Sequence, residues 1–464
     1  MKNNLLIPFL VLGSFSSFAQ KPNIIIILAD DQRAYGTIHA LGGNEVITPN
    51  LDALVKSGIT FTNSYIMGGS QAAVCAPSRN MLLTGRGLFS IGGRGNIILP
   101  QNATIGETLR KAGYYTYGIG KWHNDQATFN RTFQNGDEIF FGGMSTQFNV
   151  PLYHYSSTGE YKSKLPLPQD KTKTGNADHF FPGKHSSEIF SEAGVKFIQN
   201  YKDNKPFFLY VAFTAPHDPR VMPEKYKAMY DTAKISLPPN FMTKHPFDNG
   251  ELKVRDEKLA GFPRTPSEIK IHIRDYYAMI THLDEQIGHI IQALKDKGVY
   301  ENTIIVFAGD NGLALGQHGL MGKQNVYEHS VKVPLIIAGK NLPKGQTNPD
   351  FAYLFDIFPT ICDLTEISIP TTVQGQSLFG KNVKPRNIMF YGYRDFQRAV
   401  RKGDWKLIEY KVDGKRTTQL FNLKDDPYEL KNLAGKVSSI KELEMLQKEL
   451  AKQQTMHGDT VKIQ

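Results

Sequence analysis

The 464-residue sequence contains little cysteine, with Cys75 and Cys362 the two in the whole chain. They lie far apart in sequence, so no disulfide framework is available to hold the fold together. No cysteine and histidine spacing typical of a zinc site occurs either. Beyond the first twenty residues no apolar run is long enough to cross a bilayer, and we expect no transmembrane anchor. The 40% hydrophobic content instead predicts a large apolar core.

The sequence also lacks any dense run of basic residues, although its formal net charge is +10. The basic residues are spread along the chain and no nucleic-acid motif occurs, so we expect no nucleic-acid partner. A positive charge still favours anionic ligands, and a small acidic substrate or an anionic polysaccharide fits best. The alternative is that the charge only aids solubility.

The N-terminus has the parts of a secretory signal peptide. "MKNNLLIPFLVLGSFSSFAQ" has one lysine, an apolar run, and then Ser17 and Ala19 at the −3 and −1 positions of a cleavage site. The apolar run, Leu5–Leu12, is too short to span a bilayer, so a membrane anchor is the weaker alternative. We expect a signal peptide over residues 1–19 and an exported, mature chain from Gln20. The periplasm is the expected location, and secretion is the alternative.

Four apolar runs are each followed by polar residues that can do chemistry. Continuous Ile, Val and Phe runs that alternate with helical segments predict an α/β fold, with a mostly parallel central sheet sandwiched by helices. Sheets of this kind bind ligands at the carboxyl ends of their strands. Distant segments are therefore expected to meet in one active site. The residues at these ends are Asp30, Asp31, Lys121, His123, His217, Asp310 and Asn311.

One helical segment has an especially regular apolar stripe. On the same helix, His282 and His289 are expected to face solvent. The stripe consists of Ile280, Leu283, Ile287, Ile290 and Leu294.

The pattern changes near residue 387, where short antiparallel strands with a turn at Asp413-Gly414 are expected. We therefore predict a catalytic domain over 20–386 and a smaller C-terminal α+β subdomain over 387–464 that contains an antiparallel sheet. A terminal helix should place one apolar face on that sheet, made of Ile440, Leu443, Leu446 and Leu450.

The acidic residues at the strand ends predict a metal site. Asp30 and Asp31 are adjacent carboxylates that repel each other unless a cation lies between them. Asp310 and Asn311 would add a carboxylate and an amide oxygen. An all-oxygen set suits a hard divalent ion, Ca²⁺ or Mg²⁺.

Positive side chains are expected around this metal. Lys121 and Lys323 would bind a tetrahedral oxyanion, and His123 or His217 can protonate a leaving oxygen. Taken singly, each residue also fits a surface lysine or a histidine bonded to backbone.

The two cysteines have different settings. Cys362 lies in "YLFDIFPTICDLTEI", whose helical apolar spacing predicts a small core residue. Cys75 is left single, which indicates a chemical role. A soft thiolate matches a hard, oxygen-coordinated metal poorly, whereas the hydrate of an aldehyde made from Cys75 would offer a hard oxygen ligand and nucleophile.

The stretch "CAPSRNMLLTGR" resembles the signature of the formylglycine-dependent sulfatases of the alkaline phosphatase superfamily. Their C-x-P-S-R…TGR element directs conversion of the cysteine to Cα-formylglycine. The resemblance extends over residues 21 to 435. It rests on "NIIIILADDQ", "GYYTYGIGKWH", "TAPHDP", "FAGDNG", "GKQNVYEHSVKVPLII" and "VRKGDWKLI…LFNLKDDPYELKNLA".

The resemblance implies a metal, usually Ca²⁺ with Mg²⁺ as the alternative, and a partner enzyme that generates the formylglycine. The hydrated aldehyde would attack sulfur, and the resulting sulfate ester would be eliminated to regenerate the aldehyde. The implied metal ligands are Asp30, Asp31, Asp310, Asn311 and the modified Cys75.

The resemblance also assigns roles to the positive residues. Arg79 would orient the diol, and Lys121 and Lys323 would hold sulfate oxygens. His123 is the expected base in the elimination step and His217 the expected acid at the leaving oxygen, although these two roles can be exchanged.

The expected substrate is a sulfated oligo- or polysaccharide, such as ulvan, another algal glycan or a glycosaminoglycan. In many relatives "GKWH" continues Leu-Gly, whereas here Asn124-Asp125 follow, beside the expected sugar subsite. Two alternatives remain: a phosphomonoester or phosphonate hydrolase, and a glycan-binding relative without catalysis. Further candidates for sugar contacts are Arg33, Arg94, Trp122, His154, Arg220 and His318.

Overall fold

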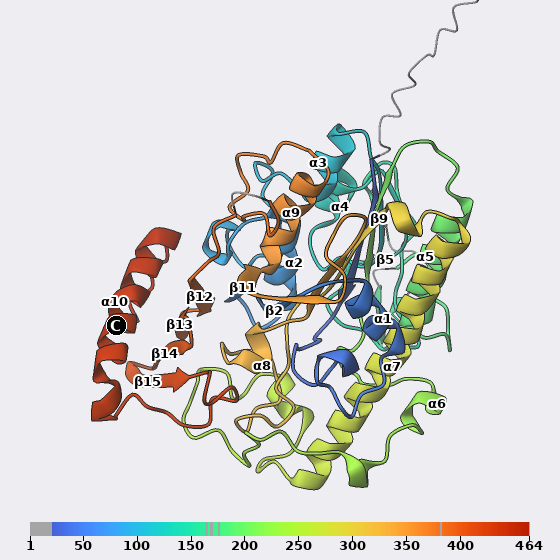
Figure 1. Ribbon diagram of the computed structural model, residues 1–464. Coiled ribbons are helices and arrows are strands. Elements are labelled where there is room, and N and C mark those ends of the chain that lie inside the picture. The colour runs from blue at the N-terminus through green and yellow to red at the C-terminus, as the bar shows by residue number, and fades with distance from the viewer. Residues whose placement is uncertain (1–20, 163–165, 168–169, 175–176, 381–382, 464) are drawn as a thin grey trace, which may run out of the picture.

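The computed structural model describes residues 21–463, apart from 163–165, 168–169, 175–176 and 381–382 (Figure 1). The expected signal peptide of residues 1–19 lies outside the described residues. Within the described part of the chain, no helix combines the length and apolar character needed to cross a membrane.

A central sheet of eight strands carries the fold. Its strands are β1 (Asn23–Ala29), β2 (Gly58–Tyr65), β4 (Tyr115–Lys121), β5 (Asn135–Phe140), β8 (Phe207–Ala212), β9 (Thr303–Gly309), β10 (Leu335–Ala338) and β11 (Gln346–Tyr353). Their spatial order is β11-β2-β10-β9-β1-β8-β4-β5. All neighbours pair in parallel except β10, which is antiparallel to both β9 and β2. The expected mostly parallel sheet is confirmed.

Both faces of the sheet are covered, which explains the unbroken apolar run of β1. All seven of its residues are buried. Ile24 and Ile26 pack into one apolar core, and Ile25 and Ile27 pack into another on the opposite face. Successive side chains of a strand point to opposite faces, so a strand between two cores must be apolar at every position.

Helices form the two outer layers. In Figure 1, α5 and α7 lie to the right of the sheet, and α2 and α9 lie to its left. Cys362 of α9 is fully buried in the second of these layers, as expected. The helices are α1 (Pro49–Ser57), α2 (Cys75–Thr84), α3 (Ile105–Lys111), α4 (Gln126–Thr132), α5 (Ser186–Asn200), α6 (Glu224–Lys227), α7 (Pro266–Asp296), α8 (Glu328–Val331) and α9 (Ile357–Leu364).

The long helix α7 buries the whole predicted stripe from Ile280 to Leu294. His289 on the same helix is exposed, as expected, but the expectation for His282 is wrong. The His282 ring is fully buried between the rings of His185 and Tyr226, with both centroid distances 4.5 Å. Because α5 and α6 pack against α7 beside its apolar stripe, a polar position next to the stripe is covered too.

A second, smaller sheet follows near the C-terminus. The strands β12 (Ile388–Tyr393), β13 (Gln397–Lys402), β14 (Trp405–Val412) and β15 (Lys415–Asn422) pair antiparallel in sequence order. The predicted turn at Asp413-Gly414 joins β14 to β15, and both residues have positive φ, as a tight hairpin turn requires. The short strand β3 (Gly68–Gly69) pairs with β12 and so completes this sheet from the N-terminal half of the chain.

The terminal helix α10 (Ile440–His457) covers the small sheet, at the left of Figure 1. Leu446 and Leu450 are fully buried, whereas Ile440, expected on the same face, is 51% exposed. Ile440 is the first residue of the helix and lies beyond the part that meets the sheet. The domain boundary near residue 387 stays a prediction. Two further short strands, β6 (Pro166–Leu167) and β7 (Asp170–Thr174), pair with each other.

Candidate active site

The carboxyl ends of β1 and β9 bring the acidic residues together. Ala29 and Gly309 are paired in the parallel register, so the residues that follow them, Asp30 and Asp310, lie side by side. The backbone N–H of Asp31 donates to Oδ1 of Asp310 at 3.0 Å. Asp30 and Asp310 are fully buried. The convergence expected from the strand ends is therefore present.

Three oxygens at this point lack a hydrogen-bond partner. They are Oδ1 of Asp30, Oδ2 of Asp31 and Oδ1 of Asn311, and all three are buried. One carboxylate oxygen from each of Asp30, Asp31 and Asp310 lies within 4.8 Å of the others. Buried unpartnered oxygens are costly unless a cation or water satisfies them. The donor set is the one that Ca²⁺ or Mg²⁺ prefers, so these residues fit such an ion.

The electrostatics of the cluster fit a cation too. Burial and the neighbouring Asp30 carboxylate raise the pKa of Asp310 to about 7, and Arg79 only partly offsets this. The pKa of Asp30 lies well below its ordinary value, because Lys121, His217 and Arg79 outweigh the effect of burial.

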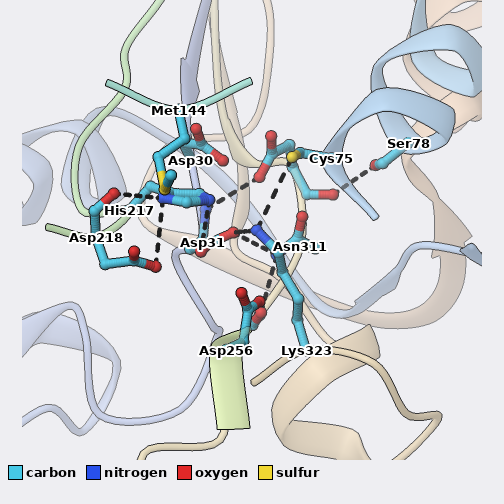
Figure 2. A network of polar contacts seen from close by, with 12 residues as sticks. Asp30, Asp31, Cys75, Ser78, Met144, His217, Asp218, Asp256, Asn311 and Lys323 are labelled. Atoms are coloured by element: carbon cyan, nitrogen blue, oxygen red, sulfur yellow. Dashed lines mark hydrogen bonds and ion pairs between the residues drawn. The ribbon is translucent and has the colours of Figure 1, made fainter. Parts of the chain in front are cut away.

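Cys75 is the first residue of α2 and points toward this cluster (Figure 2). It is buried and unpaired. Its Sγ lies 3.6 Å from Nζ of Lys121 and 3.8 Å from Nζ of Lys323. Burial raises the pKa of the thiol to about 11, although both lysines lower it. Ser78, one turn along α2, donates its hydroxyl to the backbone carbonyl of Asp310 at 2.5 Å and so fixes the helix against β9.

Arg79 is locked in place beneath these groups. It is fully buried, its Nε donates to Oδ2 of Asp310 at 2.9 Å, and its guanidinium donates to the carbonyl of Lys121 at 2.6 Å. One side chain thus links the ends of β9 and β4 to α2. The structure shows this linking role, while the orientation of a diol by Arg79 stays a prediction.

The two lysines pair with the two N-terminal carboxylates. Nζ of Lys121 contacts Oδ2 of Asp30, and Nζ of Lys323 lies 2.5 Å from Oδ1 of Asp31. Both lysines are buried. Two ammonium groups beside Cys75 and the acidic cluster are groups that can bind a tetrahedral anion.

His123 and His217 line the same cavity as Cys75. Nδ1 of His217 lies 2.7 Å from the carbonyl oxygen of Asp218 and must be the donor, because a carbonyl can only accept. The other ring nitrogen, Nε2, lies 3.7 Å from Oδ2 of Asp31. His123 has a positive φ of 58°. Burial and the positive charge of Lys121 hold the pKa of His123 well below its ordinary value. A Cβ on Gly143 would lie 2.4 Å from Nε2 of His123, so any larger residue there would displace this ring.

A cavity of about 250 Å³ opens above Cys75. On its wall, Arg255 contacts Asp256 at 2.7 Å. Arg255 also forms a two-pronged ion pair with the carboxylate of Asp218, which lies outside the lining. Nε2 of Gln324 in turn donates to Asp256 at 2.7 Å. The lining residues are Ala72, Ala73, Cys75, His123, Gly143, Met144, His217, Val254, Arg255, Asp256, Lys323 and Gln324.

The sequence reasoning missed the polar wall of this cavity. Asp218, which pairs with Arg255 behind this wall, follows His217 directly, so its place after a strand end was a usable signal. Arg255, Asp256 and Met144 lie in loops or short turns without apolar periodicity, and nothing local marks them.

The other candidates for sugar contacts lie outside the lining of this cavity. Trp122 is fully buried against Phe129 and Phe133, so it offers no surface to a sugar. His318 is also buried; its Nε2 donates to the carbonyl of Glu429 at 3.0 Å. Arg33, Arg94, His154 and Arg220 likewise lie away from the lining.

Comparison with known proteins defines the class. Residues 22–367 match the family model of the sulfatases, and residues 316–456 match the model described as N-sulphoglucosamine sulphohydrolase, C-terminal. The chain therefore belongs to the sulfatase family, which hydrolyses sulfuric esters.

Individual relatives cover nearly the whole chain. The ulvan-active sulfatase of Formosa agariphila is 30% identical over 453 residues, which span 93% of this chain and 80% of that protein. The arylsulfatase of Clostridium perfringens is 29% identical and covers 93% of this chain and 94% of its own length. A structure solved with its substrate D-glucosamine-2-N,6-O-disulfate has a TM-score of 0.75 at 23% identity, covering 95% of this chain and 99% of that one.

Proposed function

We propose that this protein is an exported sulfatase that removes sulfate from a sulfated carbohydrate, using a formylglycine made from Cys75. The observation that carries the proposal is the buried meeting of Cys75 with three unpartnered oxygens and two lysines at the carboxyl ends of the strands. Relatives that act on ulvan and on a glucosamine disulfate make a sulfated glycan the best-supported substrate class.

The metal would be held by Asp30, Asp31, Asp310, Asn311 and the oxidised side chain at position 75. A hard cation there supplies Lewis-acid stabilisation of negative charge on the sulfate and on the attacking oxygen. The unpartnered oxygens fit Ca²⁺ or Mg²⁺, as the donor chemistry requires.

The surrounding side chains would position the sulfate. Lys121 and Lys323 each have three donors, so each can keep its carboxylate partner while another donor holds a sulfate oxygen. Arg79 would hold residue 75 at a fixed position relative to the cation, because its side chain connects α2 to Asp310.

The histidines would move the protons. Because Nδ1 of His217 is fixed by the Asp218 carbonyl, Nε2 is the nitrogen that can carry a proton to the leaving sugar oxygen. His123, whose pKa is held low, suits the base. The reverse division of roles is the alternative.

The sugar would bind along the wall formed by Arg255, Asp256 and Gln324, with Asp218 holding the Arg255 guanidinium in place. Paired carboxylate and guanidinium groups at a cavity mouth can accept and donate hydrogen bonds to sugar hydroxyls. At about 250 Å³ the cavity is slightly smaller than the roughly 300–1,000 Å³ of typical ligand sites. It therefore suits one sulfated ring, with the remaining sugars outside.

Export and maturation belong to the same proposal. The signal peptide of residues 1–19 would direct the chain to the periplasm. A formylglycine-generating enzyme would act before folding, because Cys75 is 1% exposed in the folded chain.

The test is a panel of defined sulfated oligosaccharides incubated with matured protein, with free sulfate and desulfated product both measured. We expect equal amounts of the two products from at least one algal glycan or glycosaminoglycan fragment. Faster turnover of the phosphate monoester than of the sulfate ester of the same alcohol would contradict the proposal. Binding of the oligosaccharides without sulfate release would contradict it equally.

A further inference from the structure

A second group of side chains of the kinds that can hold a metal ion lies at the β5 edge of the central sheet. Two loop segments add to this edge through backbone hydrogen bonds. Ile139 and Tyr153 exchange two bonds of 2.9 Å, and Leu152 donates to the carbonyl of His179 at 3.1 Å. Three segments that are distant in sequence are thus held in register by their backbones. Such preorganised segments can present side chains to one point.

The side chains that meet there are two histidines and a carboxylate. Nδ1 of His154 lies 3.4 Å from Oδ2 of Asp178, and Nδ1 of His179 contacts Oδ1 of the same carboxylate. One ligand atom from each residue lies within 4.8 Å of the others. The two imidazole rings are 4.1 Å apart between centroids. Adjacent ligands of a tetrahedral zinc ion with bonds of about 2.1 Å are about 3.4 Å apart, which is the spacing of His154 and Asp178, while His179 and Asp178 would have to move apart to admit the ion.

A fourth residue fixes the histidine that is most buried. Oε2 of Glu138 lies 2.6 Å from Nε2 of His179. Glu138 is the extra, unpaired residue of a bulge in β5 and has a φ of 49°. A bulge of this kind changes the direction of the side chain that it carries. When Nε2–H of His179 donates a hydrogen bond to Glu138, Nδ1 carries a lone pair, which a metal lying between Nδ1 and the Asp178 carboxylate would bind. Metal-binding histidines commonly have such a carboxylate partner.

We propose that His154, Asp178 and His179 bind a borderline divalent cation of the zinc type, with Glu138 as the outer partner of His179. Two imidazoles and one carboxylate suit Zn²⁺, unlike the all-oxygen set beside Cys75. The His154 side chain is 65% exposed, so water can complete the coordination.

The cation would act as a structural clip. It would connect β5, through Glu138, to His154 and residues 178–179. The segment between β5 and His154 contains Gly143 and Met144, which line the active-site cavity. The inference is independent of the proposed reaction, because His154, Asp178 and His179 lie outside the lining of that cavity.

The experiment is a Zn²⁺ titration of the full chain in saturating Ca²⁺, followed by calorimetry and by competition with a chromophoric chelator. Excess Ca²⁺ keeps the acidic cluster at Asp310 occupied. We expect one Zn²⁺ per chain and a rise in melting temperature. His154→Ala should weaken Zn²⁺ binding by at least about 100-fold, and Glu138→Gln by about 10- to 100-fold. The control His289→Ala, which removes an exposed histidine from α7, should bind as the wild type does.

Three results would overturn the proposal. One is no Zn²⁺ uptake by the Ca²⁺-saturated wild type. Another is unchanged Zn²⁺ affinity in His154→Ala; this side chain is 65% exposed, so the variant is decisive even if His179→Ala does not fold. Loss of Zn²⁺ uptake in Asp310→Asn, with His154 intact, would place the ion at the active site instead and contradict the assignment.

Discussion

Asp310 connects the proposed metal site to the rest of the active site. It accepts from Arg79 and from the backbone of Asp31, and its backbone carbonyl accepts from Ser78. A single carboxylate thus orients α2 and the β1 end, and it would also contact the proposed cation. Such shared contacts make the geometry rigid, which a site that stabilises developing charge requires.

The first prediction concerns this carboxylate. Asp310→Asn removes one negative charge from the proposed ion site while keeping its shape. We expect Ca²⁺ affinity to fall at least about 10-fold, since ligand charge sets affinity, and sulfate release to fall at least about 100-fold. Calorimetry and a sulfate assay measure the two effects. The matched variant Asp296→Asn, at the exposed end of α7, should change neither. Undiminished Ca²⁺ binding by Asp310→Asn would contradict the assignment.

At the scale of single residues, the sequence predicts which polar side chains lie at the carboxyl ends of the strands. Asp30 and Asp310 follow buried runs, and parallel strands end at one edge, so their meeting could be anticipated. Arg255 could not be found in this way, because its partner Asp218 lies 37 residues away on another loop. Contacts between loops depend on the folded path of the chain, and no periodic pattern encodes that path.

At the scale of elements, the packing of α5, α6 and α7 creates a buried histidine. Burial, together with the nearby His185 and Lys225, lowers the pKa of His282 from 6.5 to about 2. The Glu188 carboxylate, 3.3 Å from Nε2, does not reverse this. Helical periodicity predicted α7 and its apolar stripe correctly. It failed at His282 because a helix packed on two sides also buries positions beside the stripe.

The second prediction follows from this pKa. Above pH 6.5 the ring is neutral in both states, and its contribution to stability is complete. As the pH falls below 6.5, the unfolded chain gains a proton that the folded chain does not. The free energy of unfolding therefore falls by about 1.4 kcal/mol per pH unit for this group. Urea unfolding from pH 7 to pH 4.5 should show a smaller loss in His282→Gln than in the wild type.

The control for the pH prediction is His289→Gln, which changes an exposed histidine of the same helix. We expect its acid-induced loss of stability to equal that of the wild type. If His282→Gln and the wild type lost stability in parallel, the buried ring would not be the acid-sensitive group.

At the scale of the whole molecule, buried charges join the two sheets. Nζ of Lys406 in β14 lies 2.9 Å from Glu328 of α8 and 2.8 Å from Glu429, and all three groups are buried. The central sheet and the smaller sheet could both be predicted from their patterns. Their connection through β3 could not, because a strand of two glycines carries no pattern. The antiparallel β10 was likewise not evident from its apolar residues.

The third prediction tests this connection. Lys406→Met would leave Glu328 and Glu429 buried without their shared cation. Breaking a buried pair in this way costs about 3–5 kcal/mol, so we expect the free energy of unfolding to fall by that amount. Urea unfolding at pH 7 measures it. Lys415→Met, on the exposed β15 end of the same sheet, should have little effect. A loss in Lys406→Met no larger than that of Lys415→Met would show that the pair does not hold the sheets together.

The whole account depends on the chemistry of one side chain. The most direct test is to prepare the protein with different degrees of Cys75 conversion and to measure sulfate release from the best oligosaccharide of the panel. Mass spectrometry of the peptide containing residues 72–79 gives the converted fraction from a loss of ~18 Da relative to the thiol. We predict turnover proportional to that fraction and none in Cys75→Ala. Full activity in a preparation whose Cys75 thiol is unaltered would contradict it.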